Sequence, residues 1–183
     1  MKTRPPYLQA WEDLSRDKSM IFLAGPRQSG KTTLAKMIAE TFSNGLYWNW
    51  DIADDKATLL EQNNFFTRVI RKDASVPLII FDEIHKYRDW KNYLKGIYDQ
   101  FSHEYKFLVS GSGRLDLYQK GGDSLAGRYF LFHLFPFTLS ELTGSKRPLE
   151  KFMDNPLGLT VRDPQTRLNT WKQLARLSGF PEP

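Results

Sequence analysis

The sequence predicts a three-layer α/β domain with a mostly parallel, five-stranded sheet and helices on both faces. Two observations carry this prediction. Short apolar runs recur along the chain, and segments with helical spacing lie between them. The runs are near-continuous rather than alternating, which is typical of parallel strands covered on both faces. Strands that alternate with helices in this way favour a single sheet with helices on either side.

The strands are expected where apolar or aromatic residues cluster over four to six positions. The apolar runs are Ile21–Ala24, Leu78–Phe81, Phe107–Val109 and Phe130–Phe135. A fifth segment, Leu46–Trp50, is aromatic and follows Asn44-Gly45, a pair that typically ends a helix.

Helices are expected between and after these strands, because apolar residues there repeat every three to four positions. The expected helices are residues 7–14 behind the proline pair Pro5-Pro6, residues 34–42, residues 90–101, a short helix begun by the capping box Thr138–Glu141, and residues 168–177. Residues 144–163 carry several prolines and few apolar pairs, so they are expected to form a loop. We expect a core domain over residues 1–143, followed by a loop and helix over residues 144–183.

The composition excludes several classes of protein. The chain has 183 residues and no cysteine, which excludes a disulfide framework, a thiolate zinc site and an iron–sulfur cluster. No stretch approaches the ~20 apolar residues of a membrane span, and the polar, proline-broken start is unlike a signal peptide. We therefore expect a cytoplasmic protein without a membrane partner. A formal net charge of +5 permits contact with an anion such as a nucleotide or nucleic acid.

A complete phosphate-binding pattern, G-x-x-x-x-G-K-[ST], runs from Gly25 to Thr32. It follows an apolar strand and opens a helix, so backbone N–H groups of the loop and of the helix N-terminus can face one phosphate. Lys31 would reach the β- and γ-phosphates, and the Thr32 hydroxyl would ligate Mg²⁺. The expected nucleotide contacts are Gly25, Pro26, Arg27, Gln28, Ser29, Gly30, Lys31, Thr32 and Thr33.

The second feature of the candidate site is an acidic pair, Asp82-Glu83, which directly follows the apolar strand at residues 78–81. Ligands of parallel sheets bind beyond the carboxyl ends of the strands, where Asp82 would hold Mg²⁺ directly or through water. Glu83 would then polarise a water for in-line attack on the γ-phosphate. The alternative is that the two acids only begin a helix. Because the chain has no Asn-Lys-x-Asp segment for reading guanine, ATP is favoured over GTP.

Several motifs in order resemble those of the AAA+ ATPases of bacteria and archaea in which a C-terminal domain of unknown function follows the P-loop domain. The motifs are Gly25–Thr33, Ile79–Glu83, Val109–Ser112, Ser124–Arg128 and Phe135–Leu142. The resemblance implies a P-loop NTPase fold with strand order 5-1-4-3-2. It also implies that the chain is an N-terminal fragment, or a short form without the C-terminal domain.

The same resemblance implies two further catalytic positions. Ser112 matches the polar sensor that contacts the attacking water or the γ-phosphate, with Ser110 as the alternative. Arg128 matches the arginine that reaches the nucleotide of a neighbouring subunit, with Arg114 as the alternative and a surface salt bridge as the structural interpretation of either.

These features predict a Mg²⁺-dependent ATPase that binds ATP and ADP and couples its nucleotide state to a partner domain or macromolecule. A homo-oligomer is expected for the full-length protein, and DNA or a protein is the expected partner. Two alternatives stay open: a nucleotide-gated DNA-binding switch with very slow hydrolysis, and a P-loop kinase that acts on a small molecule.

Overall fold

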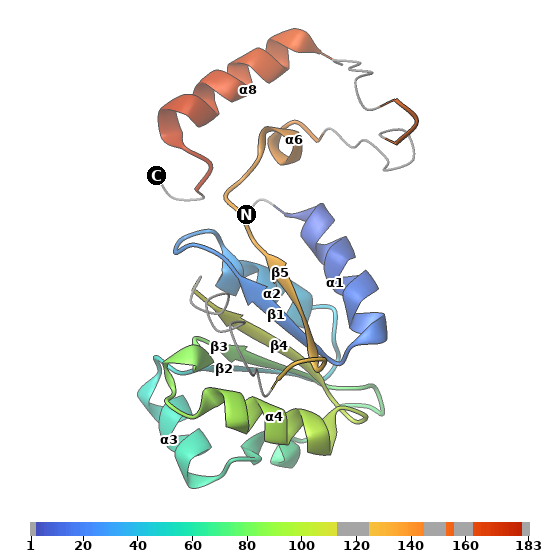
Figure 1. Cartoon of the computed structure of the whole chain (residues 1–183), viewed down its shortest axis with the longest axis vertical. Coiled ribbons are helices and arrows are strands. Elements are labelled where there is room, and N and C mark those ends of the chain that lie inside the picture. Colours follow the sequence, from blue (N-terminus) through green and yellow to red (C-terminus); the bar gives the residue numbers. More distant parts are fainter. Residues whose placement is uncertain (1–2, 113–124, 145–152, 156–162, 181–183) are drawn as a thin grey trace. The chain divides into compact units, whose positions relative to one another are not determined.

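The computed structural model of the chain describes residues 3–112, 125–144, 153–155 and 163–180 (Figure 1). The chain divides into two compact units, Met1–Leu134 and Phe135–Pro183. The predicted boundary between residues 143 and 144 stays a prediction.

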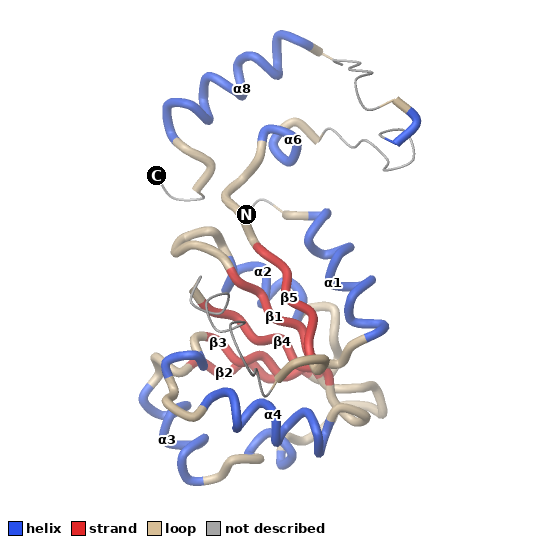
Figure 2. The backbone as a smooth tube through the Cα atoms, viewed as in Figure 1, coloured by secondary structure: helices blue, strands red, loops and turns tan. Residues whose placement is uncertain are grey.

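The first unit is built on a five-stranded sheet in which every paired strand is parallel (Figure 2). Its strands are β1 (Met20–Ala24), β2 (Gly45–Asn49), β3 (Leu78–Asp82), β4 (Lys106–Gly111) and β5 (Tyr129–His133). The observed order β2-β3-β4-β1-β5 is the predicted order 5-1-4-3-2 read from the other edge, so the predicted fold is confirmed.

The register aligns the carboxyl ends of the central strands at one edge of the sheet. Asp82 at the end of β3 lies opposite Asn49 of β2 on one side and Ser110 of β4 on the other. Ala24, the last residue of β1, lies opposite Gly111 of β4. Side chains that follow or end β1, β2, β3 and β4 therefore meet at this edge, as expected for a parallel sheet.

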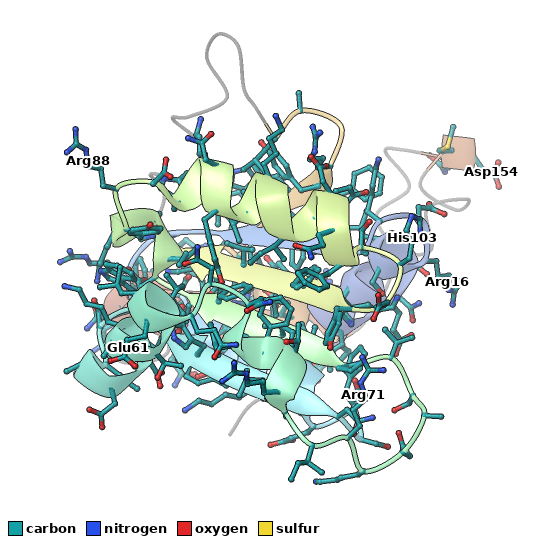
Figure 3. All side chains as sticks on the ribbon, turned by 90° about the horizontal axis from the view of Figure 1, so that it is seen from below. Arg16, Glu61, Arg71, Arg88, His103 and Asp154 are labelled. Atoms are coloured by element: carbon teal, nitrogen blue, oxygen red, sulfur yellow. The ribbon has the colours of Figure 1, made fainter. Side chains whose placement is uncertain are left out.

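One face of the sheet is covered by α3 (Ala53–Glu61), α4 (Trp90–Phe101) and the short 3-10 turns η1 (Phe65–Arg68) and η2 (Ile84–Lys86). Figure 3 shows α4 running alongside the strands of the sheet, with the labelled Arg88 and His103 just beyond its two ends. The buried cluster on this face is rich in aromatic rings: Phe22, Trp48, Phe66, Phe81, Trp90, Tyr105 and Phe107. These large rings pack between α4 and the sheet together with aliphatic side chains such as Leu94 and Ile97.

The opposite face is covered by α1 (Pro5–Asp17) and α2 (Lys31–Ala39). Trp11 of α1 packs in one cluster with Leu34 and Ile38 of α2 and with Ile21 of β1. Helix α1 begins with prolines in its first turn, as the sequence predicts. Two helical layers thus enclose the sheet, which gives the predicted three-layer architecture.

Three local features differ from the sequence predictions. Helix α3 was not predicted, because Leu59 is its single buried residue and one residue makes no helical stripe. Helix α2 ends at Ala39 rather than at residue 42. Strand β5 is half-buried rather than buried on both faces, because among the described residues it lies at the edge of the sheet, where it pairs with β1.

The second unit contains α6 (Leu139–Leu142) and α8 (Pro164–Leu177). The predicted capping box is confirmed: the Glu141 N–H donates to the Thr138 hydroxyl at 3.2 Å, and the Thr138 N–H donates to the Glu141 carboxylate at 3.0 Å. The predicted loop over residues 144–163 falls mostly outside the described residues. None of the helices in the described part of the chain is both long and apolar enough to cross a membrane.

Candidate functional site

The loop between β1 and α2 has a backbone that only glycine can form at two positions. A Cβ atom on Gly25 would lie 2.3 Å from the carbonyl oxygen of Leu134, which is far closer than real Cβ contacts. Gly30 has φ of 91°, a left-handed conformation that a side chain disfavours. Because Gly30 immediately precedes the first residue of α2, the loop leads directly into the amino end of that helix. The predicted phosphate loop therefore has the strand–loop–helix setting that its chemistry requires.

Lys31 folds back over its own loop. Its side chain is buried, and its Nζ donates to the Pro26 carbonyl at 2.7 Å. The Ser29 hydroxyl donates to the same carbonyl at 2.9 Å. Burial lowers the pKa of the Lys31 ammonium below its ordinary value, and the nearby Glu83 and Asp82 carboxylates act in the opposite direction. A phosphate at the loop would supply negative charge to an ammonium group that is already largely removed from water.

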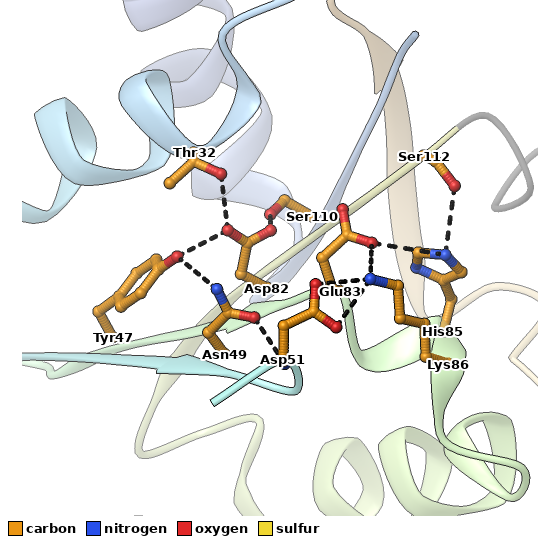
Figure 4. Close-up of polar contacts among 10 residues, drawn as sticks. All are labelled: Thr32, Tyr47, Asn49, Asp51, Asp82, Glu83, His85, Lys86, Ser110 and Ser112. Carbon is orange, nitrogen blue, oxygen red and sulfur yellow. Dashed lines mark hydrogen bonds and ion pairs between the residues drawn. The ribbon is translucent and has the colours of Figure 1, made fainter. Parts of the chain in front are cut away.

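Asp82 is the centre of a hydrogen-bond cluster at the carboxyl edge of the sheet (Figure 4). Its Oδ2 accepts from the Thr32 hydroxyl and from the Tyr47 hydroxyl, both at 2.7 Å. The Ser110 hydroxyl donates to its Oδ1. The structure thus brings together Thr32 and Asp82, the two residues that the sequence predicts to hold Mg²⁺.

Tyr47 also belongs to this cluster, although the sequence pattern predicts no role for it. Burial and the hydrogen bond to Asp82 raise the pKa of the Tyr47 phenol above its ordinary value, so the hydroxyl keeps its proton and donates it. Asn49, two residues further along β2, donates to the Tyr47 oxygen at 3.3 Å. The signal that could have found Tyr47 is the pairing of β2 with β3, which the strand pattern alone does not give.

Glu83 differs from Asp82 in both backbone and surroundings. Its φ of 58° is left-handed, which is uncommon for a residue with a side chain and turns the chain sharply after β3. Its Oε2 lies 3.2 Å from Lys86 Nζ and 3.7 Å from His85 Nε2. Lys86 Nζ also contacts Asp51 at 2.6 Å, and this hydrogen bond raises the pKa of Lys86. Glu83 is therefore held in an ion pair beside the predicted magnesium ligands (Figure 4).

The two candidate sensor serines contact different partners. Ser110 contacts Asp82, whereas the Ser112 hydroxyl lies 3.2 Å from His85 Nε2. His85 in turn approaches Glu83, so Ser112 is connected to that acid through a histidine that the sequence analysis gave no role. Which serine acts as the sensor stays a prediction.

Arg128 forms a two-pronged ion pair within its own chain. The Arg128 Nε lies 2.6 Å from Oδ1 of Asp99, and the Arg128 Nη2 lies 3.1 Å from Oδ2 of the same carboxylate. This pairing lowers the pKa of Asp99 and raises that of Arg128. Asp99 lies near the carboxyl end of α4. The predicted action of Arg128 on a neighbouring subunit stays a prediction, and the alternative, Arg114, lies outside the described residues.

The donor set at this edge fits Mg²⁺ and a nucleotide phosphate chain. Mg²⁺ prefers oxygen ligands and usually keeps several waters, so one or two protein oxygens plus phosphates suffice. The Thr32 hydroxyl and the Asp82 carboxylate are such oxygens and lie 2.7 Å apart. Among the described residues no group of three or more acidic or histidine side chains forms a larger metal cluster.

The glycine loop after β1, the buried acid at the end of β3 and the strand order together define a P-loop nucleoside triphosphate-binding domain. Residues 17–143 match the AAA domain family. The chain therefore belongs to that family, whose members are P-loop ATPases.

Relatives of this chain are considerably longer. An uncharacterised protein of Mycobacterium tuberculosis and one of Mycobacterium bovis are each 26% identical over 126 residues, which cover 69% of this chain and 27% of each relative. The chain thus spans about a quarter of the length of these curated relatives.

Solved structures share the fold at low sequence identity. A Walker-type ATPase of Pyrococcus abyssi has a TM-score of 0.59 at 14% identity, over 99% of this chain and 65% of the other. The ORC1 protein of Aeropyrum pernix in complex with DNA has a TM-score of 0.54 at 13% identity, over 96% and 56% of the two chains. At these identities the similarity concerns the fold alone.

Proposed function

We propose that this domain binds ATP with Mg²⁺ and hydrolyses the bond between its β- and γ-phosphates. The observation that carries the proposal is the 2.7 Å contact between the Thr32 hydroxyl and the Asp82 carboxylate, directly behind the phosphate loop. Two oxygens so placed, next to a buried lysine, match the needs of a metal-bound triphosphate.

Each side chain has a separate role in this proposal. The loop from Gly25 to Gly30 cradles the phosphates, and Lys31 leaves the Pro26 carbonyl to contact the β- and γ-phosphates. Thr32 and Asp82 hold Mg²⁺, which neutralises phosphate charge when bound. Glu83 orients the attacking water after release from its ion pair.

Calorimetry with a non-hydrolysable ATP analogue and Mg²⁺ tests the binding step. We expect Lys31→Ala to weaken binding by about tenfold to a hundredfold, since a charge-assisted contact to phosphate contributes roughly 1.5–3 kcal/mol. Lys56→Ala, on α3 and exposed, is the matched control and should bind like the wild type. Equal affinity of the wild type and Lys31→Ala would contradict the proposal.

A second measurement separates an ATPase from a kinase. We expect phosphate release from ATP without any added acceptor, because Glu83 is present to orient water. Strict dependence of turnover on a small-molecule acceptor would favour the kinase instead.

We further propose that the nucleotide state is coupled to a partner, either a C-terminal domain or a macromolecule such as DNA or protein, in a cytoplasmic homo-oligomer. The greater length of the mycobacterial relatives supports a partner domain. Analytical ultracentrifugation with and without ATP, on the chain alone and with added duplex DNA, tests this coupling. A sedimentation coefficient that is unchanged by ATP and DNA would count against it.

A further inference from the structure

Arg4 is the N-cap residue of α1 and lies outside the residues that match the AAA domain family. It is nevertheless as buried as Lys31 and Asp82 of the proposed nucleotide site. Among the described residues, the buried charged side chains are Arg4, Lys31 and Asp82. Lys31 and Asp82 belong to the proposed nucleotide site. Burial of a guanidinium is costly unless it gains strong contacts, so the position of Arg4 calls for a physical reason.

The contacts of Arg4 lead to the phosphate loop. Its side-chain nitrogen donates to the Ser29 carbonyl oxygen at 3.1 Å, across 25 positions of the sequence. Its guanidinium carbon lies 4.4 Å from the centre of the Tyr7 ring, a cation–π arrangement that helps to hold the group in place. Arg4 is therefore hydrogen-bonded to Ser29, the residue immediately before Gly30.

The packing of helix α1 determines the position of Arg4 relative to the phosphate loop. The Arg4 carbonyl accepts the Tyr7 and Leu8 N–H groups at the first turn of α1. Further along, Trp11 is buried against Leu34 and Ile38 of α2, the helix that the phosphate loop opens. The start of α1 is thus anchored to the same packed layer as the loop.

A carbonyl held on one side of a peptide bond determines where the next N–H points. The structure has no cis peptide among its described residues, so the Ser29 carbonyl and the Gly30 N–H point in opposite directions. Glycine rotates more freely than other residues, and Gly30 is already left-handed at φ of 91°. Without the hydrogen bond from Arg4, the Ser29–Gly30 peptide is free to flip. A flipped peptide would present its carbonyl oxygen, rather than its N–H, to a phosphate.

We propose that Arg4 is a positioning residue of the nucleotide site, which holds the Ser29–Gly30 peptide so that the Gly30 N–H faces the bound phosphate. This inference rests on the proposed function. It assigns to α1 a role in phosphate binding beyond covering the sheet.

The test uses Arg4→Met and Arg4→Gln, neither of which can supply the long guanidinium donor, and Arg4→Lys, which retains a charged donor. The matched control is Arg16→Met, an exposed arginine on the same helix. Calorimetry measures the affinity for inorganic pyrophosphate with Mg²⁺ and for a non-hydrolysable ATP analogue, and thermal unfolding without ligand checks the fold. We expect the Met and Gln variants to bind both ligands about tenfold more weakly, with partial recovery in Arg4→Lys.

Steady-state kinetics separates positioning from a purely structural role. The KM for ATP should rise with kcat nearly unchanged, because the contact acts on phosphate binding and not on the water. A folded Met or Gln variant with wild-type affinity for pyrophosphate overturns the inference. In the wild-type protein, the Gly30 amide resonance should shift when pyrophosphate is added, and an unshifted resonance with pyrophosphate bound also overturns it. Failure of the wild type to bind either ligand would instead contradict the proposed function.

Discussion

Asp82 and Glu83 are adjacent in the chain but have different neighbours, and this difference predicts a division of labour. Asp82 is held by three hydroxyl groups, whereas Glu83 is paired with Lys86. We expect Asp82→Asn to weaken Mg²⁺-dependent ATP binding about tenfold, since an amide is a poorer ligand for Mg²⁺. Glu83→Gln should keep binding within about twofold and lower kcat by about a hundredfold or more. Titration of Mg²⁺ at fixed ATP, followed by single-turnover hydrolysis, distinguishes the two. Wild-type hydrolysis by Glu83→Gln would place the water-orienting group elsewhere.

Lys86 forms an ion pair with the Glu83 carboxylate, at 3.2 Å between Nζ and Oε2. Because Asp51 binds the same ammonium at 2.6 Å, the ion pair is held from two sides. We expect Lys86→Gln to free the carboxylate and raise kcat by up to about tenfold, with little change in the KM for ATP. Lys91→Gln on α4 is the control and should leave kcat unchanged. A decrease in kcat for Lys86→Gln would mean that the pair positions Glu83 for the reaction.

The sequence predicted some contacts of the site and missed others for a physical reason. Thr32 and Asp82 could be brought together in advance, since both follow the carboxyl ends of parallel strands. Tyr47 could not, because a tyrosine in an aromatic strand is ordinarily a core residue and its reach to Asp82 depends on how β2 pairs with β3. The choice between Ser110 and Ser112 also depends on pairing, which sets Ser110 opposite Asp82.

Helices α4 and α3 show when a helix can be predicted from the spacing of its apolar residues and when it cannot. Helix α4 buries Trp90, Leu94 and Ile97 at helical spacing, so its stripe is visible in the sequence. Helix α3 buries Leu59 alone and shows no such stripe. A helix that lies at the edge of a core is stabilised by its surroundings more than by its own pattern.

Helix α4 also provides a stability prediction. Leu94 is fully buried in the aromatic cluster on its face of the sheet. We expect Leu94→Ala to lower the free energy of unfolding by about 2–5 kcal/mol, through lost burial and the cavity left behind. Urea unfolding measures the change. Gln100→Ala, exposed on the same helix, should stay within about 0.5 kcal/mol of the wild type. A cost for Leu94→Ala no larger than that of the control would show that the cluster repacks around the gap.

At the scale of the whole molecule, the strand order could be given in advance through the family resemblance, whereas spacing alone supported only a parallel sheet. The chain order of the strands differs from their spatial order, and no local pattern records that difference. The role of Arg128 likewise depends on information beyond one chain.

We predict that Arg128 acts on the nucleotide of a neighbouring subunit. Arginines that contact the γ-phosphate in this way contribute about 10³–10⁵ in rate, so Arg128→Ala should reduce kcat far more than ATP affinity. Oligomers that mix Glu83→Gln subunits with Arg128→Ala subunits should recover activity that neither variant has alone. The measurement is ATP turnover across mixing ratios, in a sample shown to exchange subunits.

The ion pair with Asp99 supplies the control for this prediction. Asp99→Asn removes the negative charge that pairs with Arg128 but keeps the arginine, so its activity should equal or exceed that of the wild type. If mixed oligomers show no recovery and Asp99→Asn is as impaired as Arg128→Ala, then Arg128 serves the fold of its own chain.

The hydrogen bonds among the residues of the proposed site have a consequence for the energetics of nucleotide exchange. The Lys31 ammonium is hydrogen-bonded to the Pro26 carbonyl, and the Thr32 hydroxyl is hydrogen-bonded to the Asp82 carboxylate. The groups proposed to hold ATP and Mg²⁺ therefore already have hydrogen-bond partners within the protein. Arrival of the ligand replaces these bonds instead of adding bonds to empty donors, and its departure restores them. Affinity is then the small difference between two satisfied states. A contact of about 1 kcal/mol made elsewhere, by a partner or by a neighbouring subunit, is enough to change the ratio of bound to free protein about fivefold.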